Sequence, residues 1–357
     1  MKMNRRQFGF GAGALGLGSA LGGKLFGISA AGAADTRFQA ASGMPVRSIS
    51  YVAQEVAVAK GFLAEEGMEL EIINAGGGSN LRDLVGSGQI AFGVADSAHP
   101  LLLTNRNRPA KILLSLDSRS PLVSIVIRQE LYDQGIDSIQ KLAAWRRKDG
   151  SQPNFGVTSL GGGQHVYISY LAEKQGVADQ FTWLAGGGES TILGGLSTGQ
   201  FDAIAAMPNL SFVATQRKWG QVVFNVGDDK QWNDAFGGPV PSTVAFCLQQ
   251  TIDDKPEMVQ AYVNGMYRAL RWLNKSSVDE IYEVVAPLYA GDFDEETIRR
   301  EIEFLEPIHS KDGSVKEDEF ANLAPVLFRE MTAMQEVSYQ DAVDTSFLDK
   351  AQKEHGE

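Results

Sequence analysis

Apolar residues recur along the chain with two spacings, which predict a regular succession of strands and helices. Short apolar runs are typical of buried strands, whereas apolar residues three or four positions apart are typical of one helix face. In the first part of the chain, residues 35–44 are interpreted as a linker. The predicted strands that follow are 47–51, 68–73, 90–95 and 111–116, and the predicted helices are 54–66 and two that start near 79 and 97. This alternation predicts a parallel sheet.

A second alternating set predicts a second lobe with its own parallel sheet. Its predicted strands are 154–158, 181–185 and 201–206, with helices over 163–174 and from 189. Two further β-rich stretches, 122–128 and 242–249, carry no helix, and we interpret them as hinge strands that cross between the lobes. The predicted fold class is therefore α/β, with two parallel-sheet lobes joined by two hinge strands.

The chain from residue 256 onward is predicted to be almost wholly helical. Amphipathic or acidic helical patterns cover 257–273, 278–288, 295–305 and 317–334. We expect these helices to pack against the first lobe. The predicted domains are a leader over 1–33, a first lobe over 35–125 and 245–357, and a second lobe over 126–244.

A near-repeat supports the prediction of two related lobes. The glycine triplet 76–78 leads ten residues later to a Gly-Gln pair at 88–89, and the triplet 186–188 leads to a second pair at 199–200. Each copy lies in a strand, glycine turn, helix and strand unit, and the two spacings differ by one residue. The period is too long for a solenoid.

The first residues resemble an export signal. Arg5 and Arg6 precede an uncharged stretch, 8–23, in which seven of sixteen residues are glycine. Small residues at 31–33 provide a cleavage site, and Lys24 resembles the basic residue of twin-arginine signals. The alternative is a membrane anchor, but the apolar run is shorter than the roughly 20 residues that a spanning helix needs. We expect cleavage and export to the periplasm by the twin-arginine route.

Charge and cysteine content narrow the function classes. The net charge is −12, and removal of the leader, with four basic residues and no acid, takes it to −16. This balance argues against nucleic-acid binding. The single cysteine, Cys247, allows no intramolecular disulfide, and no cysteine follows the cleavage site to carry a lipid. HExxH, CxxC and EF-hand spacings do not occur, so we expect no metal and no cofactor.

Ligands of open parallel sheets bind beyond the carboxyl ends of the strands, where loops lead into helices. The turn over 159–165 has this position and contains three glycines followed by Gln164 and His165. Free backbone amides and the positive end of a helix dipole suit an anion such as a carboxylate or sulfonate. Alternatively, the glycines only let strand and helix pack closely. The glycine loops do not match the nucleotide-binding motifs.

Charged and aromatic residues lie near other strand ends. Arg119 and Arg82 are placed to pair with an anion, although a surface or interlobe salt bridge explains a lone arginine at least as well. Tyr51 is a candidate apolar wall, whereas Trp183 lies inside a strand and fits the core better. Asp96 either binds ligand or caps the helix that follows it.

Six segments carry a family resemblance: 51–67, 84–94, 135–142, 156–176, 196–208 and 343–350. In order and spacing they resemble the periplasmic binding proteins of nitrate, sulfonate and taurine ABC importers, a group that includes binders of thiamine-pyrimidine precursors. The resemblance covers nearly the whole chain after the leader. It implies the type II periplasmic-binding fold, in which two lobes close over ligand by hinge bending.

The resemblance also implies ligand-binding positions at the strand ends. Together with Arg119, the candidates are Tyr51, Gln54, Asn80, Asp96, Ser97, Gly162, Gly163, Gln164, His165, Glu189, Ser190 and Asn209. The chain departs from several relatives at 207–208, where Met-Pro stands in place of an acidic residue and proline. This change removes a partner for a ligand amine and favours an anion with a less polar remainder over taurine.

We therefore expect an exported, monomeric solute-binding protein that captures a small organic anion, of sulfonate or carboxylate type, and delivers it to an inner-membrane ABC permease. We do not expect an enzyme. One alternative is an enzyme on the same fold, of desulfinase or pyrimidine-synthase type, but these rely on cysteines that the chain lacks at the matching loop. The other alternative is a periplasmic ligand sensor, which uses the same closure.

Overall fold

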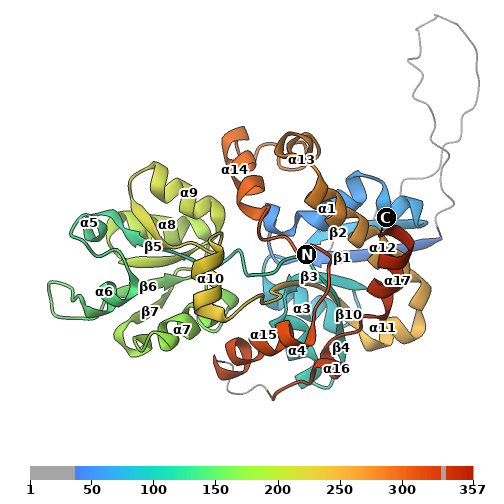
Figure 1. Cartoon of the computed structure of the whole chain (residues 1–357), viewed down its shortest axis with the longest axis horizontal. Helices are drawn as coiled ribbons and strands as arrows, with labels where there is room; N and C mark the ends of the chain where they lie inside the picture. The colour runs from blue at the N-terminus through green and yellow to red at the C-terminus, as the bar shows by residue number, and fades with distance from the viewer. Residues whose placement is uncertain (1–36, 331–334, 357) are drawn as a thin grey trace, which may run out of the picture. The chain divides into compact units, whose positions relative to one another are not determined.

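The structure of the protein is a computed structural model that describes residues 37–330 and 335–356. Ala34–Glu357 form one compact unit, and its elements are labelled in Figure 1. The predicted leader over 1–33 lies outside the described residues.

The first sheet has five strands in the order β2-β1-β3-β10-β4. The strands are β1 (Phe38–Met44), β2 (Met68–Asn74), β3 (Phe92–Asp96), β4 (Ala110–Ser115) and β10 (Thr243–Leu248). β1 is parallel to β2 and β3, whereas β10 is antiparallel to β3 and β4. Every residue of β10 is buried, as expected for an apolar strand inside a sheet covered on both faces.

The second sheet also has five strands, in the order β7-β6-β8-β5-β9. They are β5 (Ser124–Arg128), β6 (Asn154–Val157), β7 (Thr182–Ala185), β8 (Ala203–Ala206) and β9 (Gly220–Phe224). β6 is parallel to β7 and β8, and β5 is antiparallel to β8 and β9. We call the parts built on the first and second sheets the first and second lobe.

The two sheets exchange one strand each. β5 follows β4 in the chain but lies in the second sheet, and β10 follows the second-lobe strands but lies in the first sheet. The two stretches predicted as hinge strands are therefore strands within sheets, and the chain crosses between the lobes just before them, over 116–123 and 225–242. The chain enters β5 and β10 from the other lobe and not through a crossover helix of the same sheet. Both sheets are consequently mixed, not wholly parallel.

Two predictions for the start of the first lobe are wrong. Residues 35–44, predicted as a linker, contain β1, and the predicted strand 47–51 contains the 3-10 helix η1 (Ile49–Tyr51). β1 has no β-branched residue, so its strand conformation depends on pairing with β2 and β3 on its two sides. In η1, the Ser48 hydroxyl accepts a hydrogen bond from the Ser50 N–H at 3.3 Å and caps the helical turn.

Helices surround both sheets (Figure 1). The predicted helix 54–66 is divided into α1 (Val52–Ala59) and α2 (Phe62–Glu65), because Gly61 between them has φ = +74°. Helices that follow strands are α3 (Gly78–Gly86), α4 (Ala98–Asn105), α7 (Gly163–Lys174), α8 (Glu189–Thr198) and α9 (Pro208–Gln216). The others before the C-terminal part are α5 (Gln129–Tyr132), α6 (Ile139–Ala144), η2 (Ala178–Gln180), α10 (Asp229–Phe236) and α11 (Gln249–Asp254).

The C-terminal helices contact the first lobe, and two of them also contact helices of the second lobe. They are α12 (Pro256–Lys275), α13 (Val278–Val285), α14 (Glu295–Leu305), α15 (Glu317–Glu330), α16 (Tyr339–Ala342) and α17 (Ser346–His355). α12 packs on α1, α2 and α17, and its Tyr262 ring stacks on Phe92 with centroids 3.8 Å apart. α14 contacts α9, where Phe304 meets Phe212, and α15 contacts α7.

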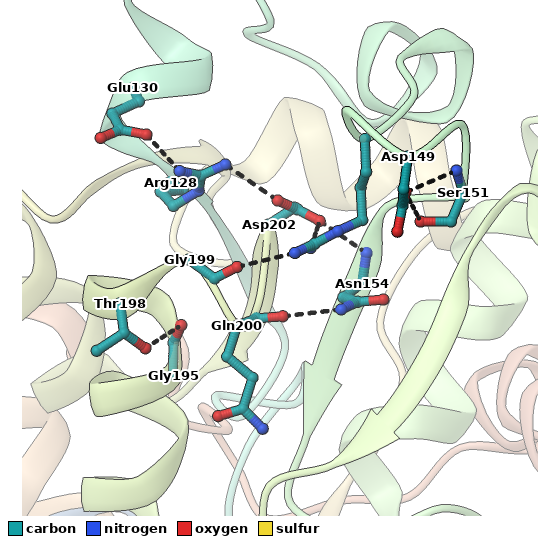
Figure 2. Close-up of polar contacts among 11 residues, drawn as sticks. Arg128, Glu130, Asp149, Ser151, Asn154, Gly195, Thr198, Gly199, Gln200 and Asp202 are labelled. Carbon is teal, nitrogen blue, oxygen red and sulfur yellow. Dashed lines mark hydrogen bonds and ion pairs between the residues drawn. The ribbon is translucent and has the colours of Figure 1, made fainter.

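A buried carboxylate connects several segments of the second lobe (Figure 2). Asp202 has no exposed surface and accepts hydrogen bonds from Arg128, from Arg147 and from the Asn154 backbone N–H. Arg128 also pairs with the exposed carboxylate of Glu130. Because a buried charge is tolerated only when it is paired and hydrogen-bonded, these contacts fix β5, the turn before β6 and the start of β8 relative to one another.

Candidate functional site

A cavity of about 430 Å³ lies between the two lobes. Its first-lobe wall consists of Pro45, Tyr51, Gly77, Gly78, Ser79, Arg82, Asp96, Ala98, His99 and Leu102. Residues 159–164 and Val166 form the second-lobe wall, and Leu122 and Leu327 complete the lining. β3 and β6 end at this cavity, so it has the position at which open α/β sheets bind ligands.

Three other cavities in the described part of the chain each belong to one lobe. One of about 460 Å³ is lined by first-lobe residues that include 39–41 and 87–91. Another of about 550 Å³ lies beside Asp202 in the second lobe. A third, of about 280 Å³, lies in the first lobe and is lined by residues that include 107–109 and 248–250. A ligand in any of these three cavities contacts one lobe and does not bridge the two. The interlobe cavity is therefore the candidate site.

Three helices begin at the interlobe cavity. α3 begins at Gly78, α4 at Ala98 and α7 at Gly163, and all three residues line the cavity. The N-cap residues of α3 and α7 are glycines, so no side chain at the cap accepts the first backbone N–H groups. The positive ends of the helix dipoles therefore converge on one space, and this arrangement suits an anion.

Arg82 and His99 contribute one cation and one neutral ring to the first-lobe wall. The Arg82 side chain is 13% exposed, and its Nε lies 3.5 Å from Asp83 Oδ1. His99 packs on the start of α3, where a Cβ added to Gly78 would lie 2.5 Å from His99 Nε2. Burial, assisted by the charge of Arg82, lowers the pKa of His99 to about 4, so its imidazole is neutral at neutral pH.

Asp96 places a carboxyl group in the same cavity, at the end of β3. Its Oδ1 accepts a hydrogen bond from the Ala98 N–H at 2.9 Å, and its Oδ2 lies 3.4 Å from the Ser242 hydroxyl. Burial raises the pKa of Asp96 to about 6, although these two hydrogen bonds act in the opposite direction. The two alternatives for Asp96, helix capping and ligand contact, are thus compatible, because the two oxygens have different surroundings.

A second buried carboxylate, Asp117, joins the two crossing segments behind the cavity. It accepts the backbone N–H groups of Ser242 and Thr243, each at 2.9 Å from Oδ1. Burial raises the pKa of Asp117 to about 8, and Asp96 adds to this rise. Nearby, the hydroxyls of Ser97 and Tyr167 are buried without a hydrogen-bond partner, although the Tyr167 hydroxyl lies close to Ser97 and Ser242.

Apolar side chains form much of the remaining wall. They come from distant parts of the chain: Pro45, Leu102, Leu122, Leu160, Val166 and Leu327. Leu327 belongs to α15, which contacts α7 of the second lobe. The cavity thus combines a polar end at the helix N-termini with an apolar surface, the usual composition of a small-molecule site.

The sequence pattern of the NMT1-like family matches residues 46–286, more than half of the chain. The chain belongs to the NMT1-like family. No curated protein sequence matches it. The matched range includes both crossing segments and every cavity residue except Pro45 and Leu327.

Solved structures resemble this NMT1-like protein over most of its length. A protein from Bordetella bronchiseptica RB50 is 20% identical with a TM-score of 0.72, covering 89% of this chain and 98% of its own. The alkanesulfonate-binding protein SsuA from Xanthomonas axonopodis pv. citri, bound to MOPS, is 13% identical with a TM-score of 0.65, covering 86% and 98%. The periplasmic nitrate-binding protein NrtA from Synechocystis PCC 6803 is 13% identical with a TM-score of 0.68, covering 89% of each chain. These likenesses confirm the predicted periplasmic-binding fold.

Five of the predicted ligand residues line the cavity of the NMT1-like chain: Tyr51, Asp96, Gly162, Gly163 and Gln164. Ser97 is fully buried directly beside them. Gln164 Oε1 accepts a hydrogen bond from the Thr158 N–H at 3.2 Å, so this side chain also holds the glycine turn in shape. The strand-end positions were therefore informative where a glycine turn or a helix start follows the strand.

Other predicted ligand residues have different positions. Gln54 is buried and accepts a hydrogen bond from Ser42, Asn80 is exposed and bonds to the Ala75 carbonyl, and Asn209 accepts the Leu210 N–H. The side chains of Glu189 and Ser190, at the start of α8, lie outside what the structure describes. None of these five residues is among the described cavity residues.

Arg119 and His165 have structural contacts outside the cavity. Arg119 donates to the Val226 carbonyl at 3.1 Å and pairs with Asp229, so it forms a salt bridge between the two crossing segments. The His165 ring packs against Trp183 with centroids 5.0 Å apart, and its Nδ1 accepts the Gly161 N–H. Both residues shape the walls around the cavity instead of lining it.

The thiol of Cys247 lies inside the first sheet, and Cys247 is not among the residues that line the cavity. Cys247 is fully buried in β10, and burial raises the pKa of its thiol. None of the described helices is both long and apolar enough to span a bilayer. Among the same residues, no group of three or more histidines, cysteines or acidic residues is arranged to hold a metal ion.

Proposed function

We propose that the protein is the exported solute-binding component of an ABC importer and captures a small organic anion, of sulfonate or carboxylate type, between its lobes. One observation carries this proposal: the N-termini of three helices, from both lobes, meet beside Arg82 at a single cavity. Such an arrangement stabilises one negative charge without a metal ion. The apolar wall suits an organic remainder.

The mechanism that we propose is capture by lobe closure. A ligand that touches Gly78 of the first lobe and Gly163 of the second stabilises the closed form relative to any open form. The crossing segments 116–123 and 225–242 act as the hinge, and Asp117 holds them together during the movement. The closed protein then docks on a permease in the inner membrane. The likeness to an alkanesulfonate-binding protein and a nitrate-binding protein supports this function.

Export to the periplasm, cleavage of a twin-arginine leader over 1–33 and a monomeric state belong to the same proposal. A binding role is supported over cysteine-based chemistry, because the thiol of Cys247 is buried in the first sheet, outside the cavity lining.

Ligand addition is expected to stabilise the protein. After unfolding and refolding to remove carried-over ligand, an anion at about 100 times its Kd should add about 2.7 kcal/mol to the free energy of unfolding. The measurement is a thermal-shift screen of alkanesulfonates, carboxylates and nitrate, followed by recovery of the ligand. Uncharged alcohols of the same chain length are the matched controls. Stabilisation by alcohols and anions alike would contradict the anion site, and recovery of an altered compound would indicate an enzyme.

Closure is expected to make the protein more compact. A saturating anion should decrease the radius of gyration measured by small-angle X-ray scattering, because the ligand holds the lobes together. The control is an alcohol that gives no thermal shift. An unchanged radius of gyration at full saturation would show that capture occurs without lobe movement.

A further inference from the structure

Asp96 lies at the place where the proposed anion must bind. Its Oδ1 accepts the Ala98 N–H at the start of α4, whereas Oδ2 has only a long contact, 3.4 Å, with the Ser242 hydroxyl. Asp96 lines the cavity. Across the cavity, a Cβ added to Gly163 would lie 3.4 Å from Oδ2, so the start of α7 lies close to this oxygen. No ion pair links Asp96 to a cation among residues 37–330 and 335–356.

Several titratable groups face Asp96 from the surrounding elements. Asp117, on the first crossing segment, has a pKa raised to about 8, because burial and the nearby Asp96 both disfavour its charged form. Tyr167 on α7 is a buried neutral phenol whose hydroxyl lies close to Ser97 and Ser242. His99 on α4 is neutral at neutral pH, and Arg82 on α3 lines the same wall of the cavity.

An ionised Asp96 and a bound anion cannot both occupy this site without strong repulsion. They would share the same helix N-termini, in a space from which the ligand displaces water. In enzymes, two neighbouring carboxyl groups avoid this repulsion by sharing one proton. A protonated Asp96 does more than remove a charge, because its Oδ2–H becomes a hydrogen-bond donor directed at the ligand.

We propose that Asp96 determines the ligand specificity of the site as a neutral acid: its Oδ2–H donates a hydrogen bond to the bound anion, so capture takes up one proton from solvent. This inference rests on the proposed function. A neutral Asp96 selects ligands that have an oxygen able to accept a hydrogen bond. It disfavours a ligand with an ammonium group, because that group would require the ionised carboxylate.

The pH dependence follows from this proton. Burial gives Asp96 a pKa of about 6 in the ligand-free protein, and a bound anion raises it further. Below about pH 6 both forms already carry the proton, so the Kd is constant. Above that pH the free protein has lost the proton that the complex needs, so the Kd rises by up to about tenfold per pH unit. Over the same range His99 remains neutral, whereas Asp117, with a pKa of about 8, ionises only at the upper end.

The experiment is isothermal titration of the full chain with butanesulfonate, which stays ionised from about pH 5 to pH 9. Repeating it in two buffers of different ionisation enthalpy counts the protons taken up. We expect uptake to approach one proton per ligand above about pH 6 in the wild-type protein. Asp96→Asn, which keeps an N–H donor, should have a pH-independent Kd and take up no proton. Asp133→Asn, at the exposed residue that follows α5, should retain the wild-type slope.

The variant Asp117→Asn distinguishes the contribution of Asp117 to the pH dependence from that of Asp96. It should keep the slope and its onset near pH 6, because Asp117, with a pKa of about 8, is already neutral at that pH. Tight binding with a pH-independent Kd in the wild-type protein would overturn the inference and leave the proposed function intact. A slope that persists in Asp96→Asn would also overturn it. Absence of binding at every pH would remove the proposed function and the inference together. If Asp96→Asn does not fold, the wild-type proton count decides.

Discussion

Replacing Asp202 with alanine should lower the free energy of unfolding by about 3–5 kcal/mol, the usual cost of breaking a buried ion pair. Asp202 is fully buried and holds both Arg128 and Arg147, whose side chains are 19% and 27% exposed. Removing the carboxylate leaves two part-buried guanidinium groups and the Asn154 N–H without their acceptor. Urea unfolding followed by circular dichroism measures the difference.

Glu130→Ala is the matched control for this prediction. Glu130 pairs with the same Arg128 (Figure 2), but the Glu130 side chain is exposed over 76% of its surface. An exposed pair contributes about 1 kcal/mol or less, so this variant should unfold almost as the wild type does. Equal losses in the two variants would contradict the argument that burial of Asp202 is the cause.

Replacing Arg82 with methionine should raise the Kd for butanesulfonate about 10- to 100-fold, because a hydrogen bond to a charged group contributes about 1.5–3 kcal/mol. Methionine keeps most of the apolar stem of the arginine. The stability of the fold should change little, since the only ion pair of Arg82 among the described residues is with the exposed Asp83. Isothermal titration at about pH 6 measures the Kd.

Lys148→Met removes the same charge from the exposed surface of the second lobe and is the control for Arg82→Met. Its Kd should match that of the wild type, apart from a small long-range effect that salt removes. If Arg82→Met also binds as the wild type does, the anion lies away from the start of α3, and the position proposed for it is wrong.

The elements with strong local signals were predictable from the sequence. The helices over 163–174 and 295–305 have the predicted bounds, because glycine or an acidic N-cap marks the start and the apolar spacing is helical throughout. β1 was missed because its residues have little strand preference, and only its two neighbours make it a strand. The 3-10 helix η1 was mistaken for a strand because alternating serines imitate the strand pattern.

Some residues of the candidate site could be predicted from the sequence, and others could not. The parallel-strand rule located Asp96 and the glycine turn 161–163, since both follow strands directly. Asp117 could not be assigned to the hinge, because its partner Ser242 is 125 residues away in sequence. Leu327 could not be assigned to the wall, since its position depends on how α15 packs against α7. Such contacts arise only when both lobes are folded.

The exchange of β5 and β10 determines the order in which the lobes can be completed during translation. All five strands of the second sheet lie between residues 124 and 224. The first sheet begins earlier, but β10 lies between β3 and β4, and among the described strands only β10 pairs with β4. The ribosome therefore finishes the strands of the second lobe before it supplies the one that joins β4 to the first sheet. Synthesis of the first lobe starts before that of the second, but the sheet of the first lobe is completed after the sheet of the second.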